Sequence, residues 1–247
     1  MIWRIAVFAL ALSAWAGSTA KAQPVVVDLS KSSVDITAGF TGTEVLLFGA
    51  TSGYGEVVVV IEGPKEIIGV RRKENVAGIW VNGRQIDFKN VPAFYKVLST
   101  NSLDEWLPLA VREENQIGVE YLNLKPLDSN IGAAEASEYR AALIRNKQQI
   151  NHYGDVERRL NLAGGRLFRS EVFFPANVPV GRYFVRTYLV DKGKIVSTRT
   201  IPLNIRKIGI EADVFRVAHQ HSALYGIAAI VIAVLAGLGG NALFRRR

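Results

Sequence analysis

The chain has 247 residues, no cysteine and a formal net charge of +8 at pH 7. The lack of cysteine excludes disulfides, thiolate metal sites and cysteine nucleophiles. Setting aside Arg4, Lys21 and the three C-terminal arginines leaves 25 basic against 22 acidic residues, a net charge of +3. So balanced a surface lacks a basic stripe for a phosphate backbone, and we expect no nucleic-acid partner.

The N-terminus has the pattern of a secretory signal peptide over residues 1–22. Arg4 supplies the positive charge, residues 5–16 are apolar, and Ala20-Lys21-Ala22 fits an A-x-A cleavage site. About a dozen apolar residues are too few to cross roughly 30 Å of hydrocarbon, although an uncleaved N-terminal anchor is the alternative. We therefore expect a mature chain that begins at Gln23 and lies outside the cytoplasm.

Residues 23–91 read as short strands. Every second residue is apolar over 25–29 and 33–36, with Val26 the one apolar residue at the positions between, which is the period of a half-buried strand. The runs 43–50 and 56–62 have apolar residues on both faces, which predicts central strands covered on both sides. Two further strands are expected around 68–70 and 86–88, with a hairpin turn at Asn82-Gly83. Trp80, just before that turn, is expected to pack in the sheet or core.

The pattern becomes helical between about 92 and 165. Residues 102–105 read Ser-Leu-Asp-Glu, a capping box before a short helix. A longer helix is predicted over 135–153, where Ala136, Tyr139 and Leu143 begin an apolar stripe at helical spacing. His152 falls near the end of this helix, where a polar residue is favourable.

Strands return after Gly164-Gly165. Residues 167–174, 182–190 and 195–205 are joined by a Pro/Gly corner and by a turn at Asp191 and Gly193. This order resembles the end of an immunoglobulin-like sandwich, with Tyr183 as a candidate tyrosine corner. We predict a mainly β protein: an immunoglobulin-like β-sandwich over 23–210 with a helical insertion at about 92–165. Two separate small domains are the alternative.

The C-terminal segment 222–244 is uncharged and rich in Ile, Ala, Val, Leu and Gly. Its length predicts one transmembrane helix, and the arginines at 245–247 predict a cytoplasmic tail. Small residues recur every fourth position and continue to a polar residue: Ala229, Ala233, Gly237 and Asn241. Such spacing is a possible packing face for self-association or for a partner's helix.

Motifs for catalysis, cofactors or metals are absent from the sequence. There is no G-x-S-x-G, no P-loop and no H-E-x-x-H, so we expect no catalytic, cofactor-binding or metal-binding residues. His219 and His221 lack further ligands nearby and are expected to be polar residues at headgroup level. The run Arg71, Arg72 and Lys73 is a possible partner- or anion-binding edge. The alternative is a strand end kept soluble by basic residues.

Several segments together resemble a known family. They are GFTGTEVLLFGA (39–50), VVVVIEGP (57–64), RRKENVAGIWVNG (71–83) and PANVPVGRYFVRTYLV (175–190). Their order resembles an alphaproteobacterial single-span membrane-protein family of unknown function. The resemblance implies an inner-membrane protein with a periplasmic domain. It also implies an accessory role beside sulfite-exporter-like transporters, because genes of the family often lie near theirs, and it supplies no catalytic residue.

We expect a non-enzymatic interaction or accessory module held to the inner membrane, with the bilayer and a membrane protein, or a second copy, as partners. The first alternative is a periplasmic ligand-binding or sensory module that uses the helical insertion as a lid. The second is an unrecognised envelope enzyme. Fold-level analogy cannot choose among them, because sites and not folds determine function.

Overall fold

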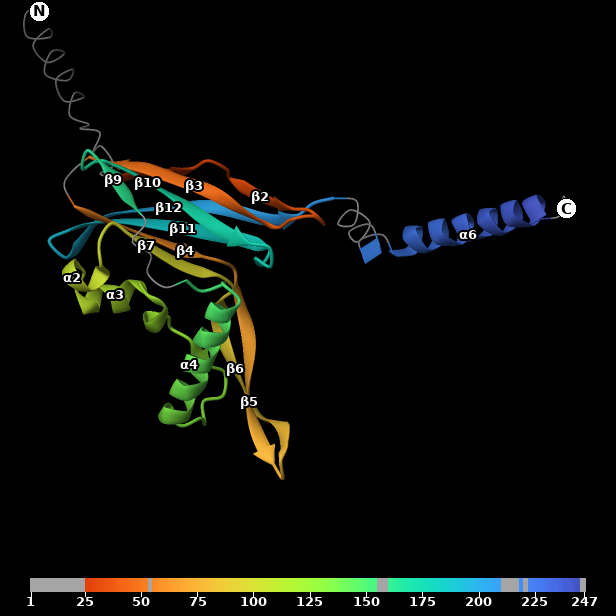
Figure 1. The fold of residues 1–247 in the computed structure, drawn as a ribbon, viewed down its shortest axis with the longest axis horizontal. Helices are drawn as coiled ribbons and strands as arrows, with labels where there is room; N and C mark the ends of the chain where they lie inside the picture. The colour runs from red at the N-terminus through yellow and green to blue at the C-terminus, as the bar shows by residue number, and fades with distance from the viewer. Residues whose placement is uncertain (1–24, 53–54, 155–159, 210–217, 220–221, 245–247) are drawn as a thin grey trace, which may run out of the picture.

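The structure is a computed structural model that describes residues 25–52, 55–154, 160–209, 218–219 and 222–244. The predicted signal peptide, the predicted cytoplasmic tail and His221 lie outside the described residues. The described chain is mainly β, as predicted, with two packed sheets, a third sheet that projects from them, and a group of helices (Figure 1).

The first sheet has the strand order β1-β3-β10-β9. Its strands are β1 (Val25–Leu29), β3 (Gly42–Thr51), β10 (Leu167–Pro175) and β9 (Asn161–Ala163). The second sheet has the order β2-β12-β11-β4-β7. Its strands are β2 (Ser33–Ile36), β12 (Lys194–Lys207), β11 (Gly181–Asp191), β4 (Glu56–Glu62) and β7 (Tyr95–Ser99). All pairs are antiparallel except β2 with β12, which is parallel.

A continuous apolar core lies between these two sheets. Strand β3 contributes Val45 and Leu47, and it faces Val59 and Ile61 of β4 across the sandwich. The alternate residues of β3, including Phe48, are exposed on the outer face. The prediction that 43–50 is covered on both faces is therefore wrong. Side chains alternate across a strand, and nothing in the described chain covers the outer face of this sheet.

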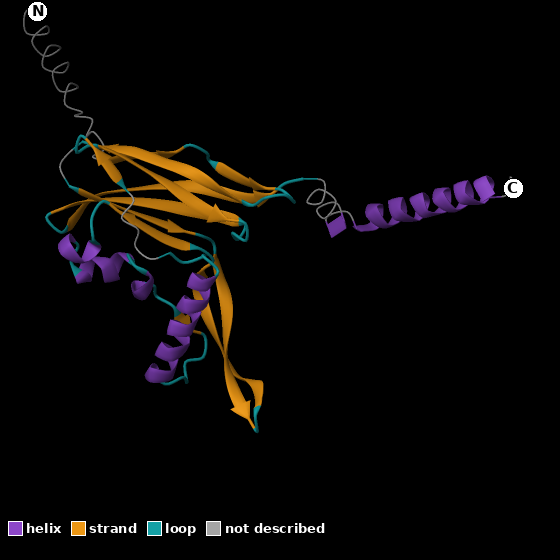
Figure 2. Ribbon diagram, viewed as in Figure 1, coloured by secondary structure: helices purple, strands orange, loops and turns teal. Residues whose placement is uncertain are grey.

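Strand β4 is buried on both faces, as predicted for 56–62. Its second face, with Val58 and Val60, belongs to another apolar core that the helices complete. These helices are α2 (Leu103–Trp106), α3 (Leu109–Asn115), the 3-10 turn η1 (Val119–Tyr121) and α4 (Ala133–Gln149). Figure 2 shows α2, α3 and α4 on the same side of the sandwich. The second sheet therefore separates two cores.

The segment predicted as a helical insertion contains strands as well as helices. Strand β7 pairs with β4, and β9 pairs with β10, so both complete sandwich sheets. Helix α4 buries Ala136, Tyr139 and Leu143, three positions of the predicted stripe. It ends at Gln149, four residues earlier than predicted. His152 follows the helix and is buried, with Nε2 3.0 Å from the backbone oxygen of Asn177.

Two predicted turn features have clear counterparts. Lys192 and Gly193 have φ values of 48° and 75°, and they turn β11 into β12 as expected for the segment beginning at Asp191. The buried Tyr183 hydroxyl donates a hydrogen bond of 2.6 Å to the carbonyl of Pro179. This is the bond from a tyrosine to the backbone a few residues upstream that characterises a tyrosine corner.

The transmembrane part of the predicted fold requires a correction. Helix α6 extends over Ser222–Phe244, the residues expected to be helical. Crossing a bilayer takes about 20 consecutive apolar residues in one helix. Among the residues that the structure describes, no helix meets both the length and the apolarity needed to cross. The prediction of one C-terminal transmembrane helix is therefore contradicted, while the mainly β prediction is confirmed.

Candidate interaction site

A two-stranded arm projects from the sandwich beside α4 (Figure 1). It consists of β5 (Lys65–Val76) and β6 (Ile79–Pro92), which form an antiparallel hairpin. The short strand β8 (Lys125–Pro126) joins its base through Phe88 and Lys89 of β6. Near the sandwich the arm is part of the second core, where Phe88 and Ile86 are buried. From residue 71 outward, almost every residue of the arm is exposed.

The turn of the arm lies at Ala77 and Gly78, with φ values of 53° and 86°. Two consecutive positive φ values are typical of the type I′ turn that matches strand twist. The Oδ1 atom of Asn75 accepts a hydrogen bond of 2.8 Å from the Gly78 N–H. The predicted turn at Asn82-Gly83 is therefore wrong, because this pair lies inside β6. A Cβ added at Gly83 would lie 2.4 Å from Oε1 of Glu74, so the flexible Glu74 side chain would have to move to accommodate it.

Helix α4 holds the arm through polar contacts. Arg84 of β6 forms ion pairs with Asp128 at 2.9 Å and with Glu135 at 3.2 Å. Arg72 of β5 lies 3.5 Å from Glu138 of α4. The Tyr139 hydroxyl adds a hydrogen bond of 3.2 Å to the carbonyl of Arg84. These groups are partly exposed, so they fix the angle between arm and helix more than they stabilise the fold.

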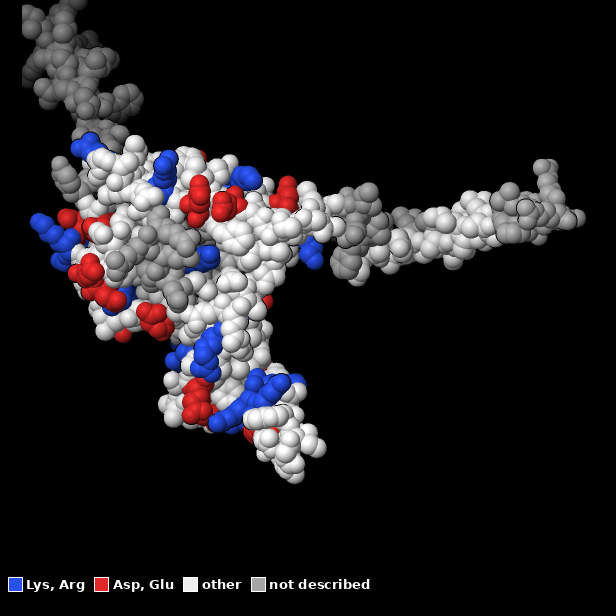
Figure 3. Space-filling model, in the orientation of Figure 1, with Lys and Arg blue, Asp and Glu red and all other residues white. Residues whose placement is uncertain are grey.

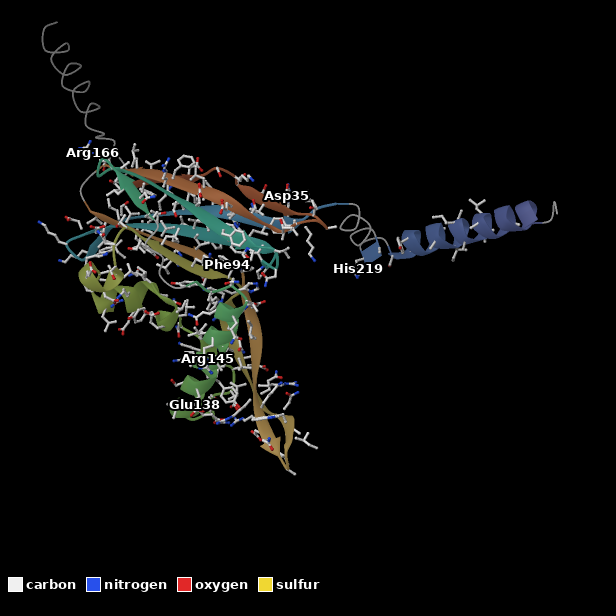
Figure 4. The ribbon with its side chains drawn as sticks, viewed as in Figure 1. Asp35, Phe94, Glu138, Arg145, Arg166 and His219 are labelled. Carbon is white, nitrogen blue, oxygen red and sulfur yellow. The ribbon has the colours of Figure 1, made fainter. Side chains whose placement is uncertain are left out.

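A groove of about 360 Å³ lies between β5 and α4. Its lining combines apolar residues with four ionisable side chains: Val70, Tyr139, Ala141 and Ala142, with Arg71, Arg72, Arg145 and Glu138. Figure 4 shows Glu138 and Arg145 on α4 beside the arm. Three guanidinium groups against one carboxylate give the groove a net positive charge. It suits an elongated anionic ligand that also has apolar atoms.

The guanidinium groups determine what this groove can bind. Among the described residues Arg71 and Arg145 form no ion pair, and Arg71 donates from Nε to Oε1 of Gln85 at 2.5 Å. An unpaired guanidinium presents a fixed fork of donors that fits a carboxylate in two bonds. Arg72 shares its charge with Glu138, so it is the less available of the three.

The basic run singled out in the sequence lies at this groove, and its partner- or anion-binding role stays a prediction. Arg71 and Arg72 line the groove, and Lys73 follows them toward the tip, at a position paired with Asn82. Strand β5 is also the edge of its sheet, so the edge-protection alternative stays open for these residues. Sequence reasoning missed Arg145 and Glu138, although Arg145 lies away from the apolar stripe of its helix. Only the packing of α4 against β5 brings Arg145 and Glu138 to the same groove as Arg71 and Arg72.

Two other predictions about single residues have definite outcomes. Trp80 was expected to pack in the sheet or the core. It lies in strand β6 opposite Asn75, but it is 67% exposed near the end of the arm. The expected core packing is wrong because the arm leaves the sandwich before this residue. His152 is buried, and burial lowers its pKa below the usual 6.5, so it is not a solvated helix terminus.

The predicted packing face on α6 is partly described. Ala229, Ala233 and Gly237 are exposed, and a Cβ added at Gly237 would meet nothing within 4 Å. The side chain of Asn241 lies outside the described residues. No contact of this face is seen in the described chain, and the packing role stays a prediction.

Two further hollows are built differently from the arm groove. One of about 330 Å³ is lined mainly by polar residues of the α3–η1 region, among them Glu113 and Glu114. Another of about 430 Å³ lies beside Trp106 and the β11–β12 turn. In the described residues no group of three or more His, Asp or Glu side chains is placed to hold a metal ion.

Comparison with known proteins identifies the family of this chain. Residues 24–246 match the model of the family described as "Putative transmembrane protein (Alph_Pro_TM)". The chain belongs to this family. The match includes the sandwich, the arm, the helices and α6, and it confirms the family expected from the sequence without confirming a single span. No curated protein matches the chain.

Proposed function

We propose that this protein is a non-enzymatic interaction module of the cell envelope, whose arm groove binds an acidic segment of a membrane-protein partner. The observation that carries the proposal is the groove between β5 and α4. There Arg71 and Arg145 form no ion pair with any described residue, and they lie beside an apolar floor where the arm leaves the sandwich. A partner segment with carboxylates and a few apolar side chains would complement both features.

The description of the family suggests membrane association, and we propose in addition where in the cell envelope the protein lies. We propose that the globular part lies on the periplasmic face of the inner membrane and assists a transporter there. Residues 1–22 support export, because their charge, apolar run and cleavage pattern are those of a secretory signal. The description of the family supports the membrane.

We also infer that the sandwich is immunoglobulin-like. Its first sheet follows the order expected for strands A-B-E-D, with β1, β3, β10 and β9 in those places. In the second sheet β4, β11 and β12 are adjacent in the order of strands C, F and G. Domains of this architecture commonly present loops and hairpins for binding, which fits an interaction module by analogy.

The chemistry of the groove favours binding over catalysis. Its ionisable groups are three arginines and Glu138, together with the Tyr139 hydroxyl that donates to the Arg84 carbonyl. Arginine stays protonated in proteins and does not act as a general base at ordinary pH. The second candidate function is ligand binding: the volume of the groove lies within the range of small-molecule sites, and a small amphipathic anion would use the same arginines.

In-cell photo-crosslinking tests the proposal. A photo-reactive phenylalanine analogue replaces Ala141 in the groove of the full chain. The matched control carries it at Val196, which is 51% exposed on β12. We expect a discrete crosslinked band with one membrane protein from position 141 and none from 196. If position 141 gives no protein crosslink while a small anion protects Arg145 from guanidine-modifying reagents, the ligand-binding function replaces the proposed one.

A further inference from the structure

The end of the arm is a second feature, distinct from the groove. Residues 75–83 contain no charged side chain, although Glu74 and Arg84 flank them directly. The exposed large apolar side chains of this tip are Val76, Ile79, Trp80 and Val81, which are 56%, 68%, 67% and 40% exposed. A cluster of this kind at the end of a projecting hairpin marks an interaction site.

The tip is apolar on both of its faces. Val76 pairs with Ile79 and Asn75 pairs with Trp80, and side chains alternate along each strand. Trp80 therefore lies on one face, while Ile79 and Val81 lie on the other. A protein partner would have to enclose the hairpin from both sides to cover this tip. A lipid bilayer surrounds an inserted hairpin without any complementary surface.

Basic residues follow immediately behind the tip. Arg71, Arg72, Lys73 and Arg84 lie in the next part of the arm, with Glu74 as their acidic neighbour. Figure 3 shows Lys and Arg side chains gathered across the arm and uncharged atoms beyond them at its end. Apolar and aromatic side chains at the end of an element with basic residues behind them fit the gradient of an anionic membrane surface.

We propose that the arm tip inserts into the headgroup region of an anionic lipid bilayer. Trp80 and Ile79 enter the interface, and Lys73, which does not line the groove, contacts lipid phosphates. The turn satisfies one of its own backbone donors, because the Gly78 N–H is bonded to Oδ1 of Asn75. This contact needs no protein partner, so it goes beyond the proposed function and is tested independently of it.

A single environment-sensitive label tests the insertion. The chain has no cysteine, so Ile79→Cys in the full chain gives one site for a nitrobenzoxadiazole label. The matched control is Val196→Cys with the same label, at an exposed apolar position on the sandwich. Both proteins are incorporated into vesicles of phosphatidylcholine with and without phosphatidylglycerol. Local quenching by nitroxide lipids and by aqueous iodide is then measured, so attachment of the chain elsewhere does not affect the result.

We expect label emission at position 79 to rise and to be quenched by nitroxide lipids in the anionic vesicles, with little change at position 196. Lys73→Glu should weaken the response at 79 by several-fold, because each basic residue near an anionic surface contributes about fivefold to binding. Equal iodide quenching at both positions would overturn the proposal. So would a response equally strong without phosphatidylglycerol.

Discussion

The hydroxyl of Tyr95 joins the second sheet to the loop between α3 and η1, and its removal should destabilise the whole protein. Tyr95 is in β7 and is 1% exposed. Its hydroxyl donates to the carbonyl of Gln116 at 2.5 Å and accepts from the N–H of Gly118 at 3.0 Å. The loop that it holds turns sharply, since Gln116 and Gly118 have φ values of 52° and 121°.

Tyr95→Phe deletes one oxygen atom and leaves two backbone groups without a partner. Leaving a buried polar group unsatisfied costs about 1–3 kcal/mol. The Gly118 bond is fully buried and the Gln116 bond partly so, and we therefore expect a loss of about 2–4 kcal/mol. For a domain of this size such a loss lowers Tm by roughly 5–12 °C.

Thermal unfolding of the full chain in detergent, followed by circular dichroism, measures this loss. Tyr139→Phe is the matched control, because its hydroxyl makes one partly buried bond of 3.2 Å to the Arg84 carbonyl. That variant should lose only about 0.5–1.5 kcal/mol. If Tyr95→Phe unfolds at the same temperature as Tyr139→Phe, the Tyr95 hydroxyl does not hold the loop between α3 and η1 to the second sheet.

Three further changes test other parts of the fold. Gly49→Ala should destabilise the protein by about 1–3 kcal/mol, because the added Cβ would lie 2.3 Å from the Phe168 ring. Gly39→Ala is the control and should have little effect, because nothing lies within 4 Å of a Cβ added there. Urea titration would compare the stabilities of the two variants. His152→Asn should flatten the dependence of the unfolding free energy on pH. Burial lowers the pKa of His152 in the folded chain below 6.5. The stability that neutral His152 contributes is therefore fully present above pH 6.5 and is lost as the pH falls through the lower folded pKa. Equal slopes for the variant and the wild-type chain in denaturation at falling pH would contradict this. Arg84→Ala should cost at most about 1 kcal/mol of global stability. It should speed hydrogen exchange in the arm, because Arg84 joins the arm to the carboxylates of Asp128 and Glu135. Unchanged exchange in the arm would refute the role of Arg84 in holding the arm against α4.

Local patterns in the sequence predicted most of the secondary structure. The alternation over 25–29 and the apolar run of 56–62 became β1 and β4, and the stripe at Ala136, Tyr139 and Leu143 became the buried face of α4. These features depend on residues close in sequence. The exposure of Phe48 could not be predicted this way, because an apolar run does not reveal whether anything covers the second face of a strand.

The candidate site was predictable only in part, for the same reason. The basic run at 71–73 is visible in the sequence, whereas Arg145 reaches the groove only because α4 packs beside β5. Trp80 was placed in the core because aromatic residues are usually buried, and no local signal showed that the hairpin leaves the sandwich. The uncharged stretch 75–83 between Glu74 and Arg84 was the available signal for an exposed tip.

The proposed function rests on the charge of the arm groove, and reversing that charge tests it most directly. The measurement is the yield of the crosslink from position 141 in chains that carry Arg71→Glu or Arg145→Glu, with Lys192→Glu on the β11–β12 turn as the control. We predict a loss of roughly tenfold or more for each groove variant, as expected for arginines central to an interface, and unchanged Tm. Groove variants that crosslink as well as the Lys192→Glu control would contradict an acidic partner in this groove.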